Sequence, residues 1–283
     1  MKDIFSLTTQ IDQAFCDHFQ NDPNVVSIFV VGSMYDMHTY KLRQNNDYDI
    51  RLLVKTVTPQ LLIEVDAFQK QLIADLSSED FAISSNNLVG LVNHKVSTEK
   101  TSLLLHLLIH TISDLDAFLP ATHQYCYSHF YRMVSGDDYL EHLKDITFEP
   151  SYLIDCHEGI DYCCDMLARN VYKYLEWTAV SETHAEFIYN EKPVTEDLIC
   201  ESVFYSLKNI FRNLYHASEN HSDPSKEMDY ILQTFAPYNM DTTLIHAVYQ
   251  RDEDCLTTYG DRLFEQAIQL MTCIKSLILE EKL

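Results

Sequence analysis

Two short apolar runs restrict the fold of this chain most strongly. Residues 25–32 (VVSIFVVG) and 47–55 (DYDIRLLVK) are rich in aliphatic and β-branched side chains, which is typical of buried strands. The flanking stretches 3–20 and 58–76 carry apolar residues at helical spacing, and Thr58 is a candidate N-cap of the second. The first half of the chain is therefore expected to form a small sheet with helices.

The second half of the chain has a different periodicity. After two further expected strands at 88–95 and 102–111, long stretches follow with apolar residues at helical spacing, at 151–180, 195–218, 226–236 and 260–282. We therefore predict an α+β protein in which a mixed β-sheet with helices precedes a C-terminal helical bundle. The expected domains are residues 1–145 and 146–283.

The charge of the chain limits its partners. There are 43 acidic and 20 basic residues, which gives a formal net charge of −23 among 283 residues. Such a surface repels phosphate backbones, so a nucleic-acid partner is not expected. The same field attracts cations, which favours a cationic small molecule as a ligand.

The sequence also indicates a cellular compartment. The eight cysteines include no CxxC pair, and the first residues (MKDIFSLTTQIDQAF) lack the apolar core of a signal peptide. No run of about 18 apolar residues occurs, so no membrane-spanning segment is expected. We therefore expect a cytoplasmic protein with reduced thiols.

Two acidic residues open the second apolar run. Side chains alternate along a strand, so Asp47 and Asp49 should lie on one face, and Arg51 should follow them there. Two carboxylates side by side repel each other unless a cation such as Mg²⁺, which prefers oxygen ligands, lies between them. Gly32 would let a phosphate approach the backbone, and amides around Ser33 could donate to its oxygens. This pattern suggests a nucleoside triphosphate bound with its metal ions.

The spacing of these residues resembles a known signature. Gly32-Ser33, thirteen residues, and then Asp47-Tyr48-Asp49 is similar to the G-S-x(9–13)-D-x-D motif of the polymerase-β-like nucleotidyltransferase superfamily. The resemblance implies that Asp47 and Asp49 bind two Mg²⁺ ions and that Gly32 and Ser33 bind the triphosphate. Small-molecule nucleotidyltransferases that modify aminoglycosides or lincosamides have a similar two-part layout.

One part of that pattern is missing. Members of the superfamily usually carry a third carboxylate on a later strand, but the candidate strand 102–111 (SLLLHLLIHT) has no acid. His106 could take this position as a metal ligand or general base. Alternatively, the base comes from the helical half, with Glu158 and Asp161 as candidates, or the site binds nucleotide without efficient transfer.

Two basic residues in the helical half are further candidates. Lys208 and Arg212 are four residues apart in a helical stretch and so share one face. We predict that they contact the triphosphate, with pairing to nearby acids as the alternative.

The resemblance implies Mg²⁺-dependent transfer of a nucleoside monophosphate from an NTP, with ATP as the first candidate, to a hydroxyl of a small molecule. Pyrophosphate would be released. Two alternatives stay open: a toxin-like nucleotidyltransferase that acts on protein or tRNA, and a non-catalytic nucleotide-binding or regulatory module with a decayed site.

Overall fold

The computed structural model describes residues 4–38, 40–90, 99–117, 127, 130–141, 152–219, 226–238, 240, 242–252, 254 and 258–280. The chain divides into two compact units. The first comprises Met1–Asp145 with Tyr174–Asn190, and the second comprises Ile146–Lys173 with Glu191–Leu283. The segment 174–190, which the sequence analysis assigned to the helical domain, thus packs with the first unit.

The first unit is built on a five-stranded mixed sheet with the order β3-β5-β2-β1-β6. β2 is antiparallel to β1 and parallel to β5, β3 is also parallel to β5, and β1 is antiparallel to β6. These strands are β1 (Val25–Val31), β2 (Asn45–Val54), β3 (Phe81–Asn86), β5 (Thr101–Thr111) and β6 (Tyr131–Gly136). The expected mixed sheet is confirmed, with β2 at its centre.

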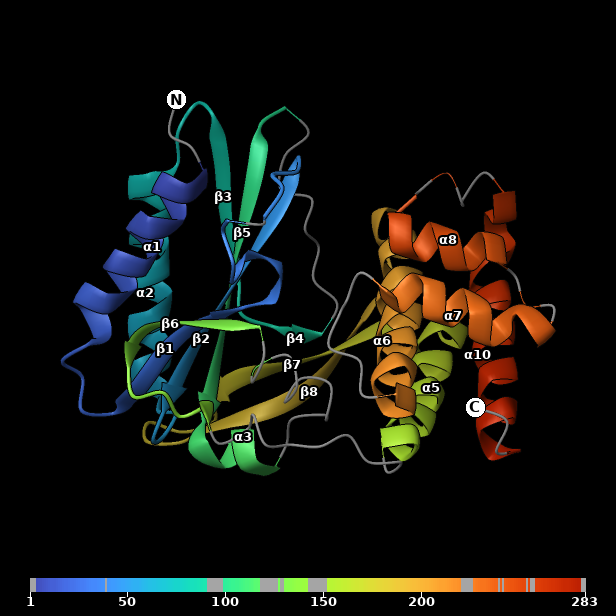
Figure 1. The fold of residues 1–283 in the computed structure, drawn as a ribbon. Coiled ribbons are helices and arrows are strands. Elements are labelled where there is room, and N and C mark those ends of the chain that lie inside the picture. Colours follow the sequence, from blue (N-terminus) through green and yellow to red (C-terminus); the bar gives the residue numbers. More distant parts are fainter. Residues whose placement is uncertain are drawn as a thin grey trace. The chain divides into compact units, whose positions relative to one another are not determined.

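Two helices cover one face of this sheet (Figure 1). They are α1 (Ile4–Phe19) and α2 (Pro59–Leu76), whose apolar residues share a core with alternate residues of β1, β2 and β5. Tyr48 and Ile50 of β2 are fully buried in that core. Because side chains alternate along a strand, the residues between and beside them lie on the opposite face of the sheet.

The ends of these elements follow local chemistry. The hydroxyl of Thr58 accepts a hydrogen bond from the amide of Leu61, which confirms it as the N-cap of α2, and Pro59 occupies the first helical position. Strands β3 and β6 were not predicted. Of the expected strand at 88–95, the structure describes β4 (Val89–Gly90) only, and residues 91–95 lie outside the described part.

A second sheet corrects the helical interpretation of residues 151–180. The helix α5 covers only Tyr152–Ala168, and it is followed by β7 (Val171–Ala179) and β8 (Ala185–Pro193) in a three-stranded sheet with the order β4-β7-β8. Asn170, at a φ of +53°, leaves the helical conformation. The next residues, VYKYLEWT, are rich in the aromatic and branched side chains that favour a strand, and this preference outweighs their helical spacing.

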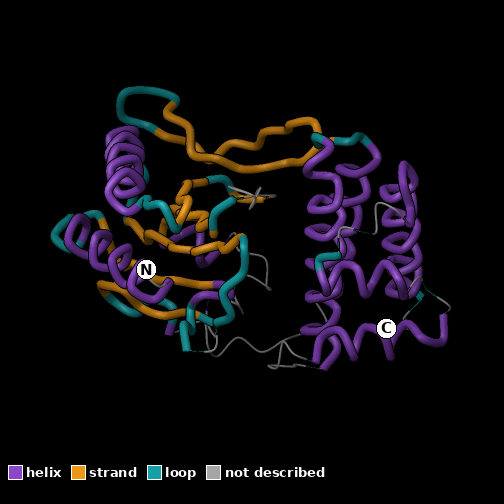
Figure 2. Tube along the Cα trace, turned by 90° about the horizontal axis from the view of Figure 1, so that it is seen from above, coloured by secondary structure: helices purple, strands orange, loops and turns teal. Residues whose placement is uncertain are grey.

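The second unit consists largely of helices (Figure 2). One apolar core joins α5, α6 (Ile199–Glu219), α7 (Glu227–Phe235), α8 (Thr242–Gln250) and α10 (Leu263–Leu279). Short 3-10 turns lie at Glu196–Leu198, Ala236–Tyr238 and Gly260–Arg262, and the short helix α3 (Ile112–Ala117) follows β5 in the first unit. The expected C-terminal helices are confirmed.

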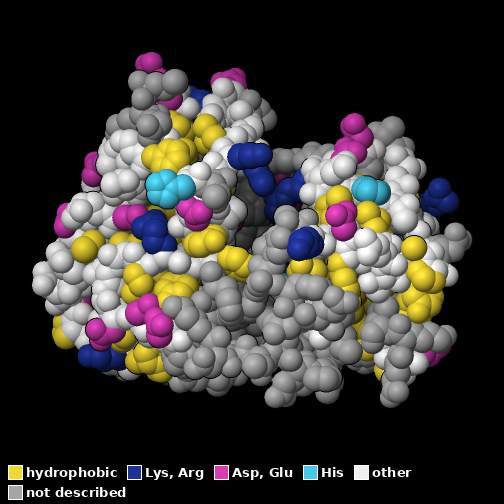
Figure 3. All heavy atoms as spheres, in the orientation of Figure 1, with side chains coloured by type: hydrophobic (Ala, Val, Ile, Leu, Met, Phe, Trp, Pro, Cys, Tyr) yellow, Lys and Arg dark blue, Asp and Glu magenta, His cyan; other side chains and the backbone are white. Residues whose placement is uncertain are grey.

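Acidic side chains lie dispersed over the face drawn in Figure 3, among basic and apolar ones. The net charge of −23 gives the chain a negative field. Among the helices that the structure describes, none has the length and apolarity that a membrane crossing requires.

Candidate active site

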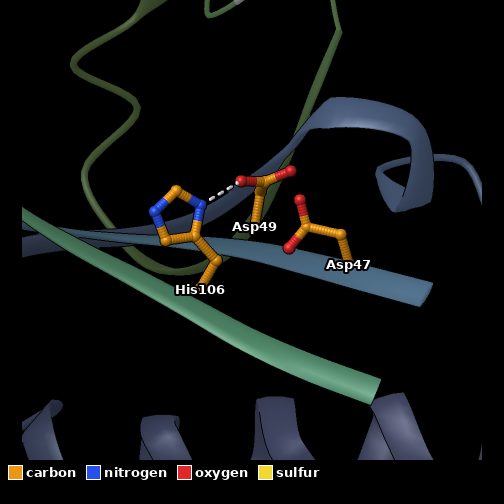
Figure 4. A group of neighbouring side chains, drawn as sticks. All are labelled: Asp47, Asp49 and His106. Carbon is orange, nitrogen blue, oxygen red and sulfur yellow. Dashed lines mark hydrogen bonds and ion pairs between the residues drawn. The ribbon is translucent and has the colours of Figure 1, made fainter. Parts of the chain in front are cut away.

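The parallel pairing of β2 with β5 brings the candidate residues together. In this register Asp49 lies directly beside His106 on the face that α1 and α2 leave open, and Asp47 precedes them on β2. One ligand atom from each of the three residues lies within 4.8 Å of the other two. Figure 4 shows the three side chains converging above the two strands.

His106 is held by both of its ring nitrogens. Nδ1 lies 2.8 Å from Oδ1 of Asp49, and Nε2 lies 2.8 Å from the carbonyl oxygen of Leu88. A carbonyl and a carboxylate both accept hydrogen bonds, so each nitrogen must carry a hydrogen for both bonds to form. One ring nitrogen of His106 therefore orients Asp49, while the other anchors the ring to the backbone at Leu88.

Arg51 bonds to Asp49, two residues before it on β2, and is 5% exposed. Its guanidinium donates to Oδ1 of Asp49 at 3.1 Å and to the hydroxyl of Tyr127 at 2.8 Å. It also donates to the carbonyls of Ile50 at 3.1 Å and His106 at 3.2 Å. These bonds fix the guanidinium in one position between β2 and β5.

This environment determines the charge of Asp49. Burial alone would raise the pKa of its carboxyl group, but the charge of Arg51 and the hydrogen bond from His106 outweigh burial, so the pKa is lowered. For Arg51, burial disfavours the charged form and so lowers the pKa, but Tyr127 and Asp49 together raise it above its ordinary value. Asp49 is therefore an anion and Arg51 a cation at neutral pH.

The Gly-Ser turn lies against Asp49. β1 pairs with β2 so that Val31 lies opposite Asp49, and the chain then enters a single 3-10 turn, Gly32–Met34. Gly32 has a φ of +77°, and a Cβ placed on it would overlap Oδ2 of Asp49. Only glycine allows this backbone to approach the carboxylate so closely. Ser33, next in the turn, is exposed.

Asn46 anchors the loop between the two halves of the motif. Its Oδ1 accepts from the hydroxyl of Tyr40 at 2.7 Å and from the amide of Arg43 at 3.0 Å. Its Nδ2 donates to the carbonyls of Arg43 at 2.8 Å and Ser102 at 2.9 Å. The end of the loop is therefore tied to the start of both β2 and β5.

The donor set suits a hard divalent cation. Asp47 and the Oδ2 side of Asp49 offer carboxylate oxygens, the ligands that Mg²⁺ prefers. Gly32 lies close to Oδ2 of Asp49, so its backbone borders the carboxylate that would hold the ion. The residues present therefore fit one such ion, held by Asp47 and Asp49 beside the turn.

Lys208 and Arg212 lie on α6 in the second unit. The ammonium of Lys208 lies 2.9 Å from Oε1 of the buried Glu227 and 3.7 Å from the ring centre of Tyr249, whose hydroxyl donates to the same oxygen at 2.8 Å. Burial lowers the pKa of Lys208, Glu227 opposes this, and the charges of Arg212 and Arg251 lower it further. Among the described side chains, none forms an ion pair with Arg212. The predicted phosphate contacts of both residues stay predictions.

The alternative candidates for a general base have other surroundings. Asp161 lies 2.5 Å from the ammonium of Lys275 within the second unit. The side chain of Glu158 lies outside the described part of the structure. His110, four residues after His106, is buried, with Nε2 lying 3.3 Å from the hydroxyl of Tyr127.

Sequence reasoning missed three groups that shape this site. They are the Tyr127 hydroxyl, the Leu88 carbonyl and the side chain of Asn46. Tyr127 and Leu88 are far from the motif in sequence, and a backbone carbonyl leaves no signal in a sequence. Asn46 directly precedes the D-x-D motif. An asparagine at this position, at the start of a predicted buried strand, is a polar residue whose hydrogen-bond partners could have been sought from the sequence.

The structure resembles one solved for another protein. It is similar to the crystal structure of the spectinomycin adenyltransferase AAD(9) from Enterococcus faecialis with ATP and spectinomycin, with a TM-score of 0.56 and 11% sequence identity. The match covers 96% of this chain and 100% of the other. No family model matches the sequence, and no curated protein matches it. The fold of this chain is therefore the one found in a nucleotidyltransferase.

Proposed function

We propose that this protein is a Mg²⁺-dependent nucleotidyltransferase. It transfers a nucleoside monophosphate from an NTP, with ATP as the first candidate, to a hydroxyl group of a small molecule. A cationic acceptor is favoured because the net charge of the chain is −23. The structural neighbour was crystallised with ATP and a small-molecule antibiotic, which supports this class of substrates.

The close approach of Gly32 to Asp49 carries the proposal. It places a turn with a positive φ and no side chain directly beside a carboxylate that stays ionised. A triphosphate needs backbone donors, and its metal ion needs carboxylates a few ångströms away. A simple surface turn would not require glycine against a partly buried acid.

At the α-phosphorus the reaction forms one bond and breaks one bond, and the acceptor hydroxyl loses its proton. The acceptor oxygen bonds to the α-phosphorus, the bond from that phosphorus to the bridging oxygen of the β-phosphate breaks, and the electron pair leaves with pyrophosphate. Mg²⁺ held by Asp47 and Asp49 would neutralise negative charge on the phosphates. Gly32 and Ser33 offer backbone amides to the phosphates, and the acceptor proton passes to a base or to water.

The two bases of α6 fit the same proposal. Arg212 pairs with none of the described acids, and its charge reaches Lys208 and Tyr249. A half-buried guanidinium in an acidic protein is suited to a phosphate group. We propose that Arg212 contacts the triphosphate, while Lys208 does so only if it leaves Glu227.

His106 favours one alternative. It occupies the position beside Asp49 where the resemblance calls for a third carboxylate, and both of its nitrogens are engaged. A site without an efficient base could bind a nucleotide and regulate a partner. Toxin-like transfer to protein also fits the same chemistry, whereas the negative charge disfavours tRNA.

Pyrophosphate release tests the proposal. Each NTP is incubated with Mg²⁺ and a panel of acceptors that includes spectinomycin, other aminocyclitols and lincosamides. We expect release with one NTP and one acceptor class, and a loss of at least about 100-fold in Asp49→Asn, because a charged ligand of the Mg²⁺ ion that would stabilise the reacting phosphates is lost. Asp12 of α1 accepts a hydrogen bond from Tyr48 on the opposite face of β2, so Asp12→Asn is the matched control and should retain activity.

A pair of glycine variants distinguishes a loss of the proposed phosphate site from a general effect of replacing glycine by alanine. Gly32→Ala should remove nucleotide binding, because its Cβ overlaps Asp49 and its φ is positive. Gly159→Ala adds a Cβ on α5 that meets no atom within 4 Å, and it should bind nucleotide normally. Nucleotide binding without release for any acceptor would favour the regulatory module, and full binding by Gly32→Ala would refute the proposed phosphate site.

A further inference from the structure

The inference concerns how many metal ions the site can hold, and it rests on the proposed function. Two divalent ions a few ångströms apart need enough negatively charged oxygen ligands to hold both. This site has two carboxylates among the described residues, Asp47 and Asp49. The number of their oxygens that remain available therefore decides the number of ions.

One oxygen of Asp49 is already committed. Oδ1 accepts from Nη2 of Arg51 at 3.1 Å and from Nδ1 of His106 at 2.8 Å. Both donors are almost fully buried, and Arg51 is fixed by three further hydrogen bonds. A metal ion at Oδ1 would have to displace the guanidinium of Arg51 and break its bond to Asp49.

His106 does not replace the missing ligand. Its second nitrogen, Nε2, is bonded to the carbonyl of Leu88, which directly precedes β4. For a ring nitrogen to bind a metal ion it must be free of hydrogen and of its present partner. Metal binding through Nδ1 would break the bond to Asp49, and binding through Nε2 would release Leu88.

The charges agree with the geometry. Arg51 pairs with Asp49, so a fixed positive charge already lies beside the carboxylates that would hold a metal ion. A second ion would lie next to the buried guanidinium and be repelled by it.

We propose that this site holds a single divalent cation, bound by Asp47 and Oδ2 of Asp49 beside Gly32. Arg51 and His106 are positioning residues that occupy Oδ1 and exclude a second ion. The guanidinium of Arg51 replaces the second metal ion at Oδ1, and His106 stands where a third carboxylate is expected. The ion retained is the one next to the turn, where the triphosphate is expected.

Equilibrium dialysis counts the ions without requiring turnover. The full chain is dialysed against Mn²⁺ and the α,β-methylene analogues of ATP, GTP, CTP and UTP in turn, which cannot release pyrophosphate. Bound manganese is measured by atomic emission and bound nucleotide by absorbance. We expect one Mn²⁺ for each bound nucleotide.

A matched pair of variants at His106 sharpens the count. His106→Asp restores a carboxylate beside Asp49 and should bind two Mn²⁺ per nucleotide. His106→Asn places a side chain of the same shape as aspartate there, but it is uncharged and can still donate to Asp49. This variant should therefore bind one Mn²⁺ per nucleotide. Circular dichroism checks that both variants are folded, and the wild-type count decides the proposal if either is not.

The outcomes separate this inference from the proposed function. Two Mn²⁺ per nucleotide in the wild type would overturn the single-ion site and leave a nucleotidyltransferase of the ordinary two-metal kind. A bound nucleotide without Mn²⁺, or a folded His106→Asp variant that still binds one ion, would also overturn it. No binding of any nucleotide would overturn both the inference and the proposed function.

Discussion

The two faces of strand β2 each carry a cluster of one aspartate, one arginine and one tyrosine. On the site face Arg51 lies between Asp49 and Tyr127 and donates to both. On the helix-covered face the hydroxyl of Tyr48 donates to the carboxylate of Asp12 on α1. There Arg132 of β6 bonds to both the hydroxyl and the carboxylate.

The pKa values of the two aspartates are nevertheless shifted in opposite directions. Burial is the largest influence on both acids and raises the pKa of each. For Asp12, Tyr48 and Arg132 compensate only partly, so its pKa stays raised. For Asp49, the buried Arg51 and His106 more than compensate, so its pKa is lowered. A buried cation that is fixed by its own hydrogen bonds therefore keeps an acid ionised, as a metal ligand must be.

The largest expected difference between the clusters comes from removing each arginine. Arg51→Met removes the guanidinium from the partly buried Asp49, which keeps its bond to His106, and should lower the free energy of unfolding by about 3 kcal/mol. The Arg132 side chain is 37% exposed, so Arg132→Met should cost about 1 kcal/mol. Urea denaturation of the two variants measures both losses. Equal losses would show that burial of the arginine does not distinguish the two faces.

Removing each tyrosine hydroxyl should give a smaller difference. Tyr127→Phe leaves Nε of the buried Arg51 without an acceptor, which should cost about 2 kcal/mol. Tyr48→Phe leaves Asp12 paired with Arg132, so its cost should be about 1 kcal/mol. The same denaturation experiment compares the two, and a larger loss in Tyr48→Phe would contradict the comparison.

The pH dependence of the two acids should have opposite signs. The pKa of Asp49 is depressed on folding, so its stabilising effect is present above its unfolded pKa, about 4, and is lost as the pH falls through the lower folded value. The pKa of Asp12 is raised, so its stabilising effect is present below about pH 4 and is lost as the pH rises through the folded value.

Two asparagine variants measure these signs. For each variant, the quantity of interest is the free energy of unfolding of the wild type minus that of the variant. As the pH falls from 7 toward 3, this difference should decrease for Asp49→Asn and increase for Asp12→Asn. This is the smallest expected effect because it is a change in a difference. Urea midpoints at a series of pH values check it, and slopes of the same sign would be inconsistent with the opposite pKa shifts.

Local periodicity explains what could be predicted here. The alternation along residues 47–51 predicted that Asp47, Asp49 and Arg51 share a face, and the bond between Arg51 and Asp49 confirms it for that pair. Apolar spacing likewise predicted α1, α2 and the later helices. It failed at 171–179, where strand-favouring residues follow a helix without a proline or glycine to mark the change.

The sequence by itself therefore determined the α+β fold class, the faces of β2 and the Gly-Ser and D-x-D elements. These follow from spacing over a few residues, which the chain's own geometry sets. Only the tertiary structure decided that His106 lies beside Asp49 and bonds through Nε2 to the carbonyl of Leu88. It also decided that the hydroxyl of Tyr127 accepts a hydrogen bond from Arg51. Those contacts join residues 18 to 76 positions apart, and they depend on strand register and core packing, which no local pattern encodes.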